Sequence, residues 1–279
     1  MAEQLTLNDI CLTHVAATIT QLLGIEAPEQ ATDPLETVLQ VAKRFFHGHK
    51  ADRVLIYNPD ALALWLFQKY TRLYDAVLRK TQIGLPMLSV MPSVTPVCFA
   101  SMYTGTMPEI HGIRKYEKPV VRTDTLFDAL IRSGKKPVII ASTDSSMSKI
   151  FLERKMDYYI YDTAEACNEK TLALIEKDEH DLILVYNGNY DAAMHRNAPE
   201  GTEAMAALKE NVAAFETLTT ATEKAWIRHN TVVCWLTDHG CHEIDGQLGS
   251  HGLDMPEDMN VMHFYGFQPA APDDPIGLS

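Results

Sequence analysis

Aspartate and histidine residues recur in this chain at spacings that suit metal ions. Asp191 and His195 are four positions apart, so a helical turn would place both side chains on one face. Asp238 and His239 directly follow an apolar run, and His251 lies twelve positions after His239. Carboxylate and imidazole groups are ligands that zinc accepts in catalytic sites with an open position. The pattern indicates a metal centre.

Two further residues, Asp60 and Thr95, complete the set of side chains that two adjacent metal ions and a nucleophile would require. Asp60 follows the apolar run RVLIY, and Thr95 precedes Pro96 at a point that suits a helix cap followed by the first helical residue. A metal-bound threonine hydroxyl loses its proton far more readily than a free one, and it can then attack phosphorus. A phosphoryl group on Thr95 would lie over the positive end of that helix, with the amides of Val97 and Cys98 as candidate donors.

A lone Asp-His pair at a strand end is more often a cap or a surface hydrogen bond than a metal site, and Thr95 alone would be read as an N-cap. The full set in one chain favours metal binding. We expect two sites about 4 Å apart, which would together bind the oxygens of a phosphoryl group. The first site would comprise Asp191, His195 and His251, and the second Asp60, Thr95, Asp238 and His239.

Composition excludes several classes of protein. The net charge is -13 over 279 residues, and this argues against general binding of nucleic acid or anionic membranes, which requires a surplus of Lys and Arg. No apolar stretch approaches the roughly 18 residues of a membrane span. The five cysteines show no short paired spacing and the N-terminus does not resemble a signal peptide, so we expect the cytoplasm.

Short apolar runs alternate with amphipathic segments, which is typical of a parallel sheet covered on both faces. The expected strands are 53–57, 87–90, 136–141, 157–161, 181–186 and 231–236, and the expected helices are 6–23, 32–46, 61–79, 96 onward, 125–133, 164–177 and 200–228. The predicted fold class is α/β, a three-layer sandwich with a mostly parallel central sheet. Ligands collect at the carboxyl ends of parallel strands, so the distant polar clusters should converge at one edge.

The pattern of the sequence predicts three parts of the chain. Residues 1–50 are predicted to form an N-terminal helical appendage, residues 51–268 the catalytic domain, and residues 269–279 a tail rich in Pro, Ala and Asp.

The motifs resemble the alkaline phosphatase superfamily, most closely its type I phosphodiesterase/nucleotide pyrophosphatase branch. That branch has a nucleophilic Thr, then Thr-Gly, Pro-Glu and His-Gly-Ile, followed by Asp-x-x-x-His, Asp-His-Gly and a late His-Gly. The matching residues here are Thr95, Thr104-Gly105, Pro108-Glu109, His111-Gly112-Ile113, Asp191 with His195, Asp238-His239-Gly240 and His251-Gly252, and Asp60 corresponds to the first metal-binding Asp.

The resemblance implies an alkaline phosphatase-like fold and a phosphoric ester hydrolase, a phosphodiesterase or phosphatase. Thr95 would attack a small phosphate ester, with two divalent metal ions as cofactors. Zinc is favoured, with manganese as the alternative. Diesters are slightly preferred over monoesters. Two other functions stay open: a phosphotransferase or mutase of the same superfamily, and a catalytically silent module that keeps its metals. A sulfatase is disfavoured because its Cys/Ser-x-Pro-x-Arg motif does not occur around Thr95.

Two departures from the branch concern the substrate. No Asn closely follows Thr95, where the branch usually places one to hold a phosphoryl oxygen, and Cys98 is the nearest polar candidate. The twelve-position spacing from His239 to His251 is much shorter than the branch commonly has, and resembles phosphopentomutases and phosphoethanolamine transferases of the superfamily. We therefore expect a reduced cap, with substrate recognition small or located in residues 1–50.

Overall fold

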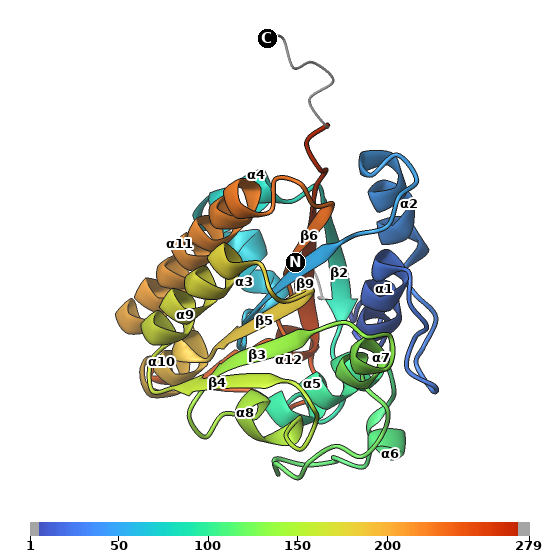
Figure 1. Cartoon of the computed structure of the whole chain (residues 1–279). Helices are drawn as coiled ribbons and strands as arrows, with labels where there is room; N and C mark the ends of the chain where they lie inside the picture. Colours follow the sequence, from blue (N-terminus) through green and yellow to red (C-terminus); the bar gives the residue numbers. More distant parts are fainter. Residues whose placement is uncertain (1–5, 273–279) are drawn as a thin grey trace, which may run out of the picture.

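A seven-stranded sheet organises the molecule, which is described here over residues 6–272 of a computed structural model. The strand order is β2-β9-β6-β1-β5-β3-β4. Strand β9 runs antiparallel to β2 and β6, and the remaining neighbours pair in parallel. Helices cover both faces (Figure 1). The predicted three-layer α/β fold with a mostly parallel sheet is confirmed.

The bounds of the elements are as follows. The strands are β1 (Arg53–Pro59), β2 (Ile83–Leu88), β3 (Pro137–Ser142), β4 (Asp157–Tyr161), β5 (Leu182–Asn187), β6 (Thr231–Trp235) and β9 (Asn260–Gln268), with a separate hairpin of β7 (His242–Ile244) and β8 (Leu248–Ser250). The helices are α1 (His14–Leu23), α2 (Glu36–Phe45), α3 (Leu64–Lys69), a 3-10 turn (Thr71–Tyr74), α4 (Asp75–Lys80), α5 (Thr95–Thr104), α6 (Pro108–His111), α7 (Leu126–Arg132), α8 (Met147–Ile150), α9 (Ala164–Lys177), α10 (Asn189–Asn197), α11 (Thr202–Ala225) and α12 (Pro256–Met259).

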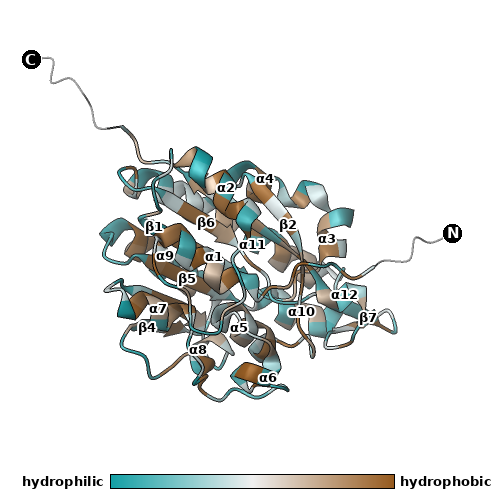
Figure 2. Cartoon of the chain, turned by 90° about the vertical axis from the view of Figure 1, so that its right-hand side faces the viewer, coloured by the Kyte–Doolittle hydropathy of each residue, from teal (hydrophilic) through white to brown (hydrophobic). Residues whose placement is uncertain are grey.

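Each face of the sheet has its own hydrophobic core, because the central strands are buried on both sides. Strand β5 shows this directly: Leu182 and Leu184 pack under α1, α5 and α7, whereas Ile183 and Val185 pack under α9 and α11. Apolar residues accordingly concentrate in the strands and on the inward sides of the helices (Figure 2). Burial of all six side chains of β5 explains why the strand is apolar without alternation from Leu182 to Val185.

The structure corrects several predicted elements, among them the helix expected over 6–23, which begins only at His14. Strand β9 was not predicted, because Asn260 and His263 interrupt its apolar run, yet both side chains are buried. The helix expected over 61–79 is divided into α3, a 3-10 turn and α4. The strand expected over 87–90 instead runs from Ile83 to Leu88.

The two N-terminal helices pack directly on the fold. Helix α1 contacts α5 and α7, and α2 contacts β9, where Phe46 meets Phe267 edge-on with ring centroids 5.8 Å apart. Whether residues 1–50 act as a separate unit stays a prediction. Of the predicted tail, residues 273–279 lie outside the described residues.

Candidate functional site

Three side chains meet beyond the carboxyl ends of the adjacent strands β1 and β6. Asp60 follows β1, and Asp238 and His239 follow β6; each is at most 1% exposed. His239 Nε2 lies 3.4 Å from Asp60 Oδ1 and 3.3 Å from Asp238 Oδ2. The other oxygen of Asp238 accepts a hydrogen bond of 3.3 Å from the backbone N–H of Ala61. One oxygen of each carboxylate therefore faces the imidazole, and we call these three residues the buried group.

Thr95 adjoins the buried group. Its Oγ1 lies 3.4 Å from Asp60 Oδ2 and 3.3 Å from His239 Nε2. The sequence placed Thr95 at the helix cap, but Val94 occupies that position and Thr95 is the first residue of α5. Its hydroxyl instead lies within hydrogen-bond distance of Asp60 and His239. The side chain is therefore directed at the polar cluster rather than at its own helix.

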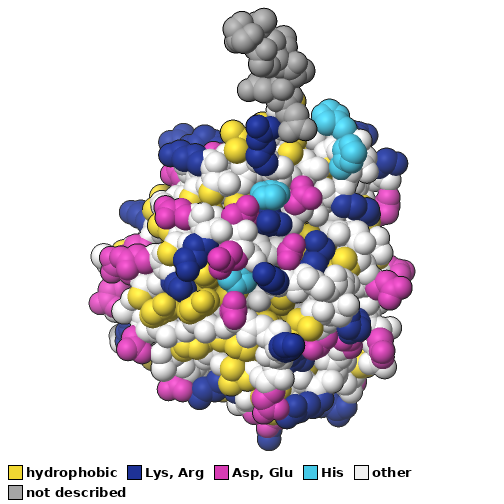
Figure 3. Space-filling model, viewed as in Figure 1, with side chains coloured by type: hydrophobic (Ala, Val, Ile, Leu, Met, Phe, Trp, Pro, Cys, Tyr) yellow, Lys and Arg dark blue, Asp and Glu magenta, His cyan; other side chains and the backbone are white. Residues whose placement is uncertain are grey.

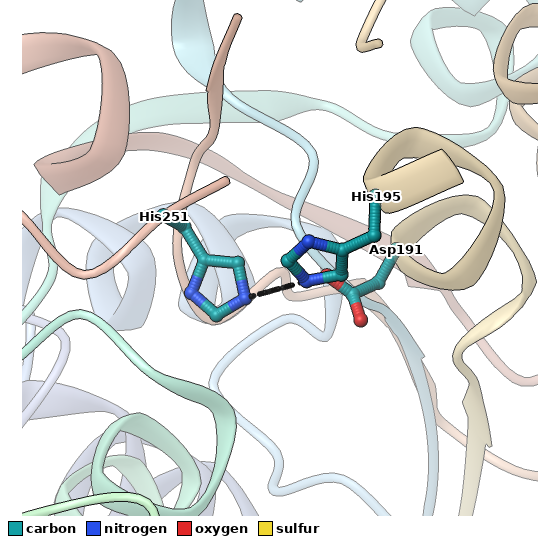
Figure 4. Close-up of side chains that lie close together, drawn as sticks. All are labelled: Asp191, His195 and His251. Atoms are coloured by element: carbon teal, nitrogen blue, oxygen red, sulfur yellow. Dashed lines mark hydrogen bonds and ion pairs between the residues drawn. The ribbon is translucent and has the colours of Figure 1, made fainter. Parts of the chain in front are cut away.

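Asp191, His195 and His251 form a second cluster, the outer group. Asp191 and His195 lie one turn apart on α10, which begins just beyond β5, and His251 follows the β7–β8 hairpin (Figure 4). Asp191 Oδ1 is 3.3 Å from His195 Nε2 and 3.5 Å from His251 Nε2, and the two Nε2 atoms are 3.2 Å apart. Three ligand atoms thus form a nearly equilateral triangle.

The two groups adjoin one another through stacked imidazole rings. The rings of His239 and His251 lie 3.9 Å apart at an interplanar angle of 23°. Convergence follows from the sheet topology, because β6, β1 and β5 are consecutive strands and each delivers its polar residues to the same edge.

Backbone carbonyl groups fix the tautomer of all three imidazoles. A carbonyl oxygen only accepts, so in the neutral imidazole each Nδ1 carries the proton and each Nε2 presents a lone pair. The pairs are His195 with Gly249 at 2.9 Å, His239 with Gly240 at 2.9 Å and His251 with Ser93 at 2.8 Å. This arrangement is the usual support of a metal-binding histidine.

The oxygens that face the imidazoles lack hydrogen-bond donors. Asp60 Oδ1, Asp191 Oδ1 and Asp238 Oδ2 are buried and accept no hydrogen bond from any described residue. A buried carboxylate without a partner is costly, and here it stands beside nitrogen lone pairs. Bonds of about 2.0–2.1 Å to a tetrahedral zinc ion put ligand atoms about 3.3 Å apart. The edges of the outer group, 3.2 to 3.5 Å, match this spacing, so both groups fit a divalent metal ion.

Without a cation, the carboxylates disturb one another. Burial, followed by the charge of Asp191, raises the pKa of Asp60 to about 6. Burial and the charge of Asp60 raise the pKa of Asp238 well above its usual value. Burial likewise opposes ionisation of Asp191, but its ion pair with His195 brings the pKa of that carboxyl below the usual value. The two groups thus bring three carboxylates together and contain no Lys or Arg that would balance their charge.

The histidines of the outer group are perturbed in opposite directions. The ion pair with Asp191 raises the pKa of His195 to about 9. Burial and the adjacent His239 lower the pKa of His251 to about 3. A difference this large between two imidazoles in contact is typical of functional sites.

Tyr186 and Ser89 support the site, and the sequence analysis missed both. The Tyr186 hydroxyl donates to Asp60 Oδ2, and its ring meets the edge of Phe99 on α5 at 5.7 Å. Ser89 Oγ donates to the carbonyl oxygen of Asp238 at 2.7 Å. Tyr186 lies in a strand that the sequence did predict, next to β1 in the sheet, but only the three-dimensional pairing brings it to Asp60.

Two expected contributions from the nucleophile helix differ in the structure: that of the Val97 and Cys98 amides and that of the Cys98 thiol. The amides of Val97 and Cys98 both donate to the Val94 carbonyl at 3.0 Å, so neither is free to bind a phosphoryl group. Cys98 is fully buried, and its Sγ lies 3.1 Å from Ser89 Oγ. His111 fixes its loop, since Nδ1 accepts the Ile113 N–H at 3.2 Å and Nε2 lies 2.8 Å from Ser101 Oγ.

Comparison with known proteins supports the resemblance. A model of the type I phosphodiesterase / nucleotide pyrophosphatase family matches residues 76–129, the segment that contains Thr95. The resemblance predicted from the sequence is confirmed. The candidate metal ligands Asp60, Asp191 and Asp238 lie outside the matched segment. No curated protein sequence is significantly similar to this chain.

Solved structures with this fold include three of ectonucleotide pyrophosphatase / phosphodiesterase 5. An inactive variant of the murine protein in complex with AMP has a TM-score of 0.58 at 15% identity and covers 70% of this chain. Other structures of the murine and human proteins have TM-scores of 0.54 and 0.56 at 16% and 15% identity, each covering 69% of the chain. This chain spans 58% of the length of each. At such identity, the likeness establishes the fold.

Within residues 6–272, no helix has the length and apolar character needed to cross a membrane.

Proposed function

We propose that this chain is a metal-dependent phosphohydrolase that uses Thr95 as its nucleophile. The observation that carries the proposal is the position of Thr95 Oγ1, 3.3 Å from His239 Nε2 and 3.4 Å from Asp60 Oδ2, with the outer group alongside. The expected substrate is a small phosphate ester, with diesters preferred slightly over monoesters. A family model that matches the Thr95 segment supports this reaction class.

The buried group and Thr95 would hold one metal ion, and the outer group a second. The metal ions supply Lewis acidity toward the phosphoryl oxygens and lower the pKa of a bound hydroxyl or water. Three carboxylates and three neutral imidazoles leave two divalent cations with a surplus of one positive charge, which suits an anionic ester. Nitrogen and oxygen ligands at tetrahedral spacing favour zinc, and manganese is the alternative.

Each residue of the site then has a separate role in the reaction. Thr95 Oγ1 loses its proton and forms a bond to phosphorus while the ester P–O bond breaks, and the leaving alcohol departs with a proton. Water then attacks the phosphothreonine, restoring the Thr95 hydroxyl and releasing the phosphate product. Tyr186 holds Asp60 Oδ2, so Oδ1 stays directed at His239. Residues 242–250 between His239 and His251 form a hairpin, so this connection offers little chain to enclose a large leaving group.

A chromogenic substrate panel tests the proposal. Protein reconstituted with zinc or manganese is assayed with an aryl phosphodiester, an aryl phosphomonoester and a nucleotide diester. We expect hydrolysis of the aryl diester by the wild type and by Thr71→Ala, an exposed control, but not by Thr95→Ala. Absence of hydrolysis of every ester after reconstitution would contradict the proposal and leave a silent metal-binding module.

A phosphotransferase or mutase would form the same covalent intermediate. The two activities separate when a small alcohol is added as a second acceptor. A hydrolase releases mainly free phosphate or monoester, whereas a transferase passes the phosphoryl group to the alcohol.

We also propose a cytoplasmic location. All five cysteines are free thiols, which suits a reducing compartment.

A further inference from the structure

A cavity of about 510 Å³ opens between α9 and α11, away from the candidate catalytic residues. The two helices lie side by side over the sheet (Figure 1). Tyr57 of β1 and Asn187 of β5 line the cavity, on the face opposite Thr95 and α5. Its volume is that of a small-molecule site. None of its lining residues belongs to the buried or the outer group.

A network of buried polar side chains lines the cavity. Tyr57 is fully buried, and Asn187 and Asn211 are each 1% exposed. Asn187 Nδ2 donates to the Tyr57 hydroxyl at 2.7 Å and to Asn168 Oδ1 at 2.9 Å. Asn211 Nδ2 donates to Asn189 Oδ1 at 2.7 Å and to the Ala207 carbonyl at 2.8 Å, and Tyr57 donates to Asn211 Oδ1 at 2.8 Å.

The three fully buried members of the network, Tyr57, Asn187 and Asn211, use all of their donors and leave one acceptor without a partner. Both amide hydrogens of Asn187 and of Asn211 are engaged, as is the hydroxyl hydrogen of Tyr57. Asn187 Oδ1, by contrast, is buried and accepts no hydrogen bond from any described residue. A buried acceptor without a donor costs free energy, so a ligand that donates hydrogen bonds would be stabilised here.

Negative charge surrounds the opening. Glu165 and Glu169 of α9 and Glu210 of α11 line the cavity, and no described Lys or Arg forms an ion pair with any of them. Acidic side chains are visible along the edge of the molecule where α9 and α11 lie (Figure 3). The carboxylates do not converge as metal ligands, since the groups able to hold an ion in the described chain are elsewhere. Leu172 and Ala214 add an apolar wall.

We propose that this cavity binds a small aliphatic amine. An ammonium group supplies positive charge and three hydrogen-bond donors and has no acceptor. It therefore complements Asn187 Oδ1, which lacks a donor, and glutamates that form no ion pair with a described Lys or Arg. The alkyl chain would lie against Leu172 and Ala214. A second ammonium group would reach the glutamates at the opening, so a diamine fits better than a monoamine.

Calorimetric titration with butane-1,4-diamine tests the proposal, with butane-1,4-diol as the uncharged counterpart. The wild type should bind the diamine at one site and give no heat with the diol. Glu165→Gln/Glu169→Gln/Glu210→Gln should weaken diamine binding at least tenfold. The control Glu26→Gln/Glu176→Gln/Glu179→Gln changes net charge equally at exposed positions outside the cavity and should weaken binding less than twofold. Equal losses in the two variants would show non-specific attraction to an acidic protein and overturn the proposal.

A cavity-filling variant separates the cavity from its rim. Ala214→Trp keeps every carboxylate but occupies the space between the helices, so it should abolish binding while the melting temperature stays near that of the wild type. Retained binding in folded Ala214→Trp would overturn the proposal. If this variant does not fold, the glutamine variants, which change exposed side chains only, decide the question. Binding of Ca²⁺ in the absence of amine, if it is lost in the same glutamine variant, would identify a metal site and would also overturn the proposal of an amine site.

Discussion

The buried group and the outer group contain the same kinds of ligand but differ in their surroundings. The side chains of the buried group are at most 1% exposed, and two of them, Asp60 and His239, face Thr95. In the outer group, the side chains of Asp191 and His195 are 21% and 42% exposed. Solvent therefore reaches the outer group and is excluded from the buried group. Electrostatic effects are stronger where water is excluded, so the nucleophile stands beside the cluster in which a cation acts most strongly.

The largest effect that this comparison predicts concerns Thr95. Thr95→Ala should lower turnover of an aryl diester about a thousandfold or more, because the covalent step is lost. Metal content, measured by elemental analysis, should change little, since the Asp and His side chains remain. Thr95→Ser should keep partial activity. An alanine variant as fast as the wild type would make Thr95 a structural residue and the nucleophile another group.

The second predicted effect is a loss of stability in acid, and it concerns His111, a buried histidine outside both groups. Burial lowers the pKa of His111 to about 4, against an ordinary value of 6.5. The unfolded chain takes up this proton near pH 6.5, so the stabilisation is complete above that pH. It is lost as pH falls toward 4, by about 3 kcal/mol in total at 1.36 kcal/mol per pKa unit.

Urea unfolding of the metal-free protein between pH 7 and pH 4 measures this loss. His111→Asn should show a shallower decline in the free energy of unfolding, whereas the exposed control His49→Asn should follow the wild type. Identical slopes in wild type and His111→Asn would assign the acid sensitivity to the metal-ligand groups instead.

Removing the Tyr186 hydroxyl should affect one group and spare the other. Tyr186→Phe keeps the ring against Phe99 but frees Asp60 Oδ2, and loss of such a supporting hydrogen bond typically weakens metal affinity 10–100-fold. Zinc affinity of the buried group should fall in competition with a chromogenic chelator, while that of the outer group stays constant. Tyr158→Phe, far along the sheet on β4, serves as the control. A loss shared by both groups would show that they do not bind independently.

The smallest effect is the order of metal release. The outer group is open to solvent at His195, so a chelator should strip it first, about tenfold faster than the buried group. Time-resolved chelation should show two phases, and His195→Ala should remove the faster one. A single phase, or loss of the slower one, would reverse the assignment of the two groups.

Much of the site could be predicted because its chemistry is local in sequence. The interval of four between Asp191 and His195 already specifies one helical face, and Asp238 with His239 directly follows a strand. Alternating strands and helices imply a parallel sheet, and a parallel sheet brings strand ends to one edge. The ligand types, their order and the α/β fold class were therefore contained in the chain itself.

Tertiary structure decided which atoms face one another. Asp60 Oδ1 is available because Tyr186, 126 positions away, occupies Oδ2, and His251 presents Nε2 because the Ser93 carbonyl, 158 positions away, holds Nδ1. Strand β9 could not be recognised because the buried His263 finds its partner in the Thr237 carbonyl at 2.7 Å. A side chain's type is set by sequence, but its hydrogen-bond partner depends on which distant segments the fold brings within about 3 Å.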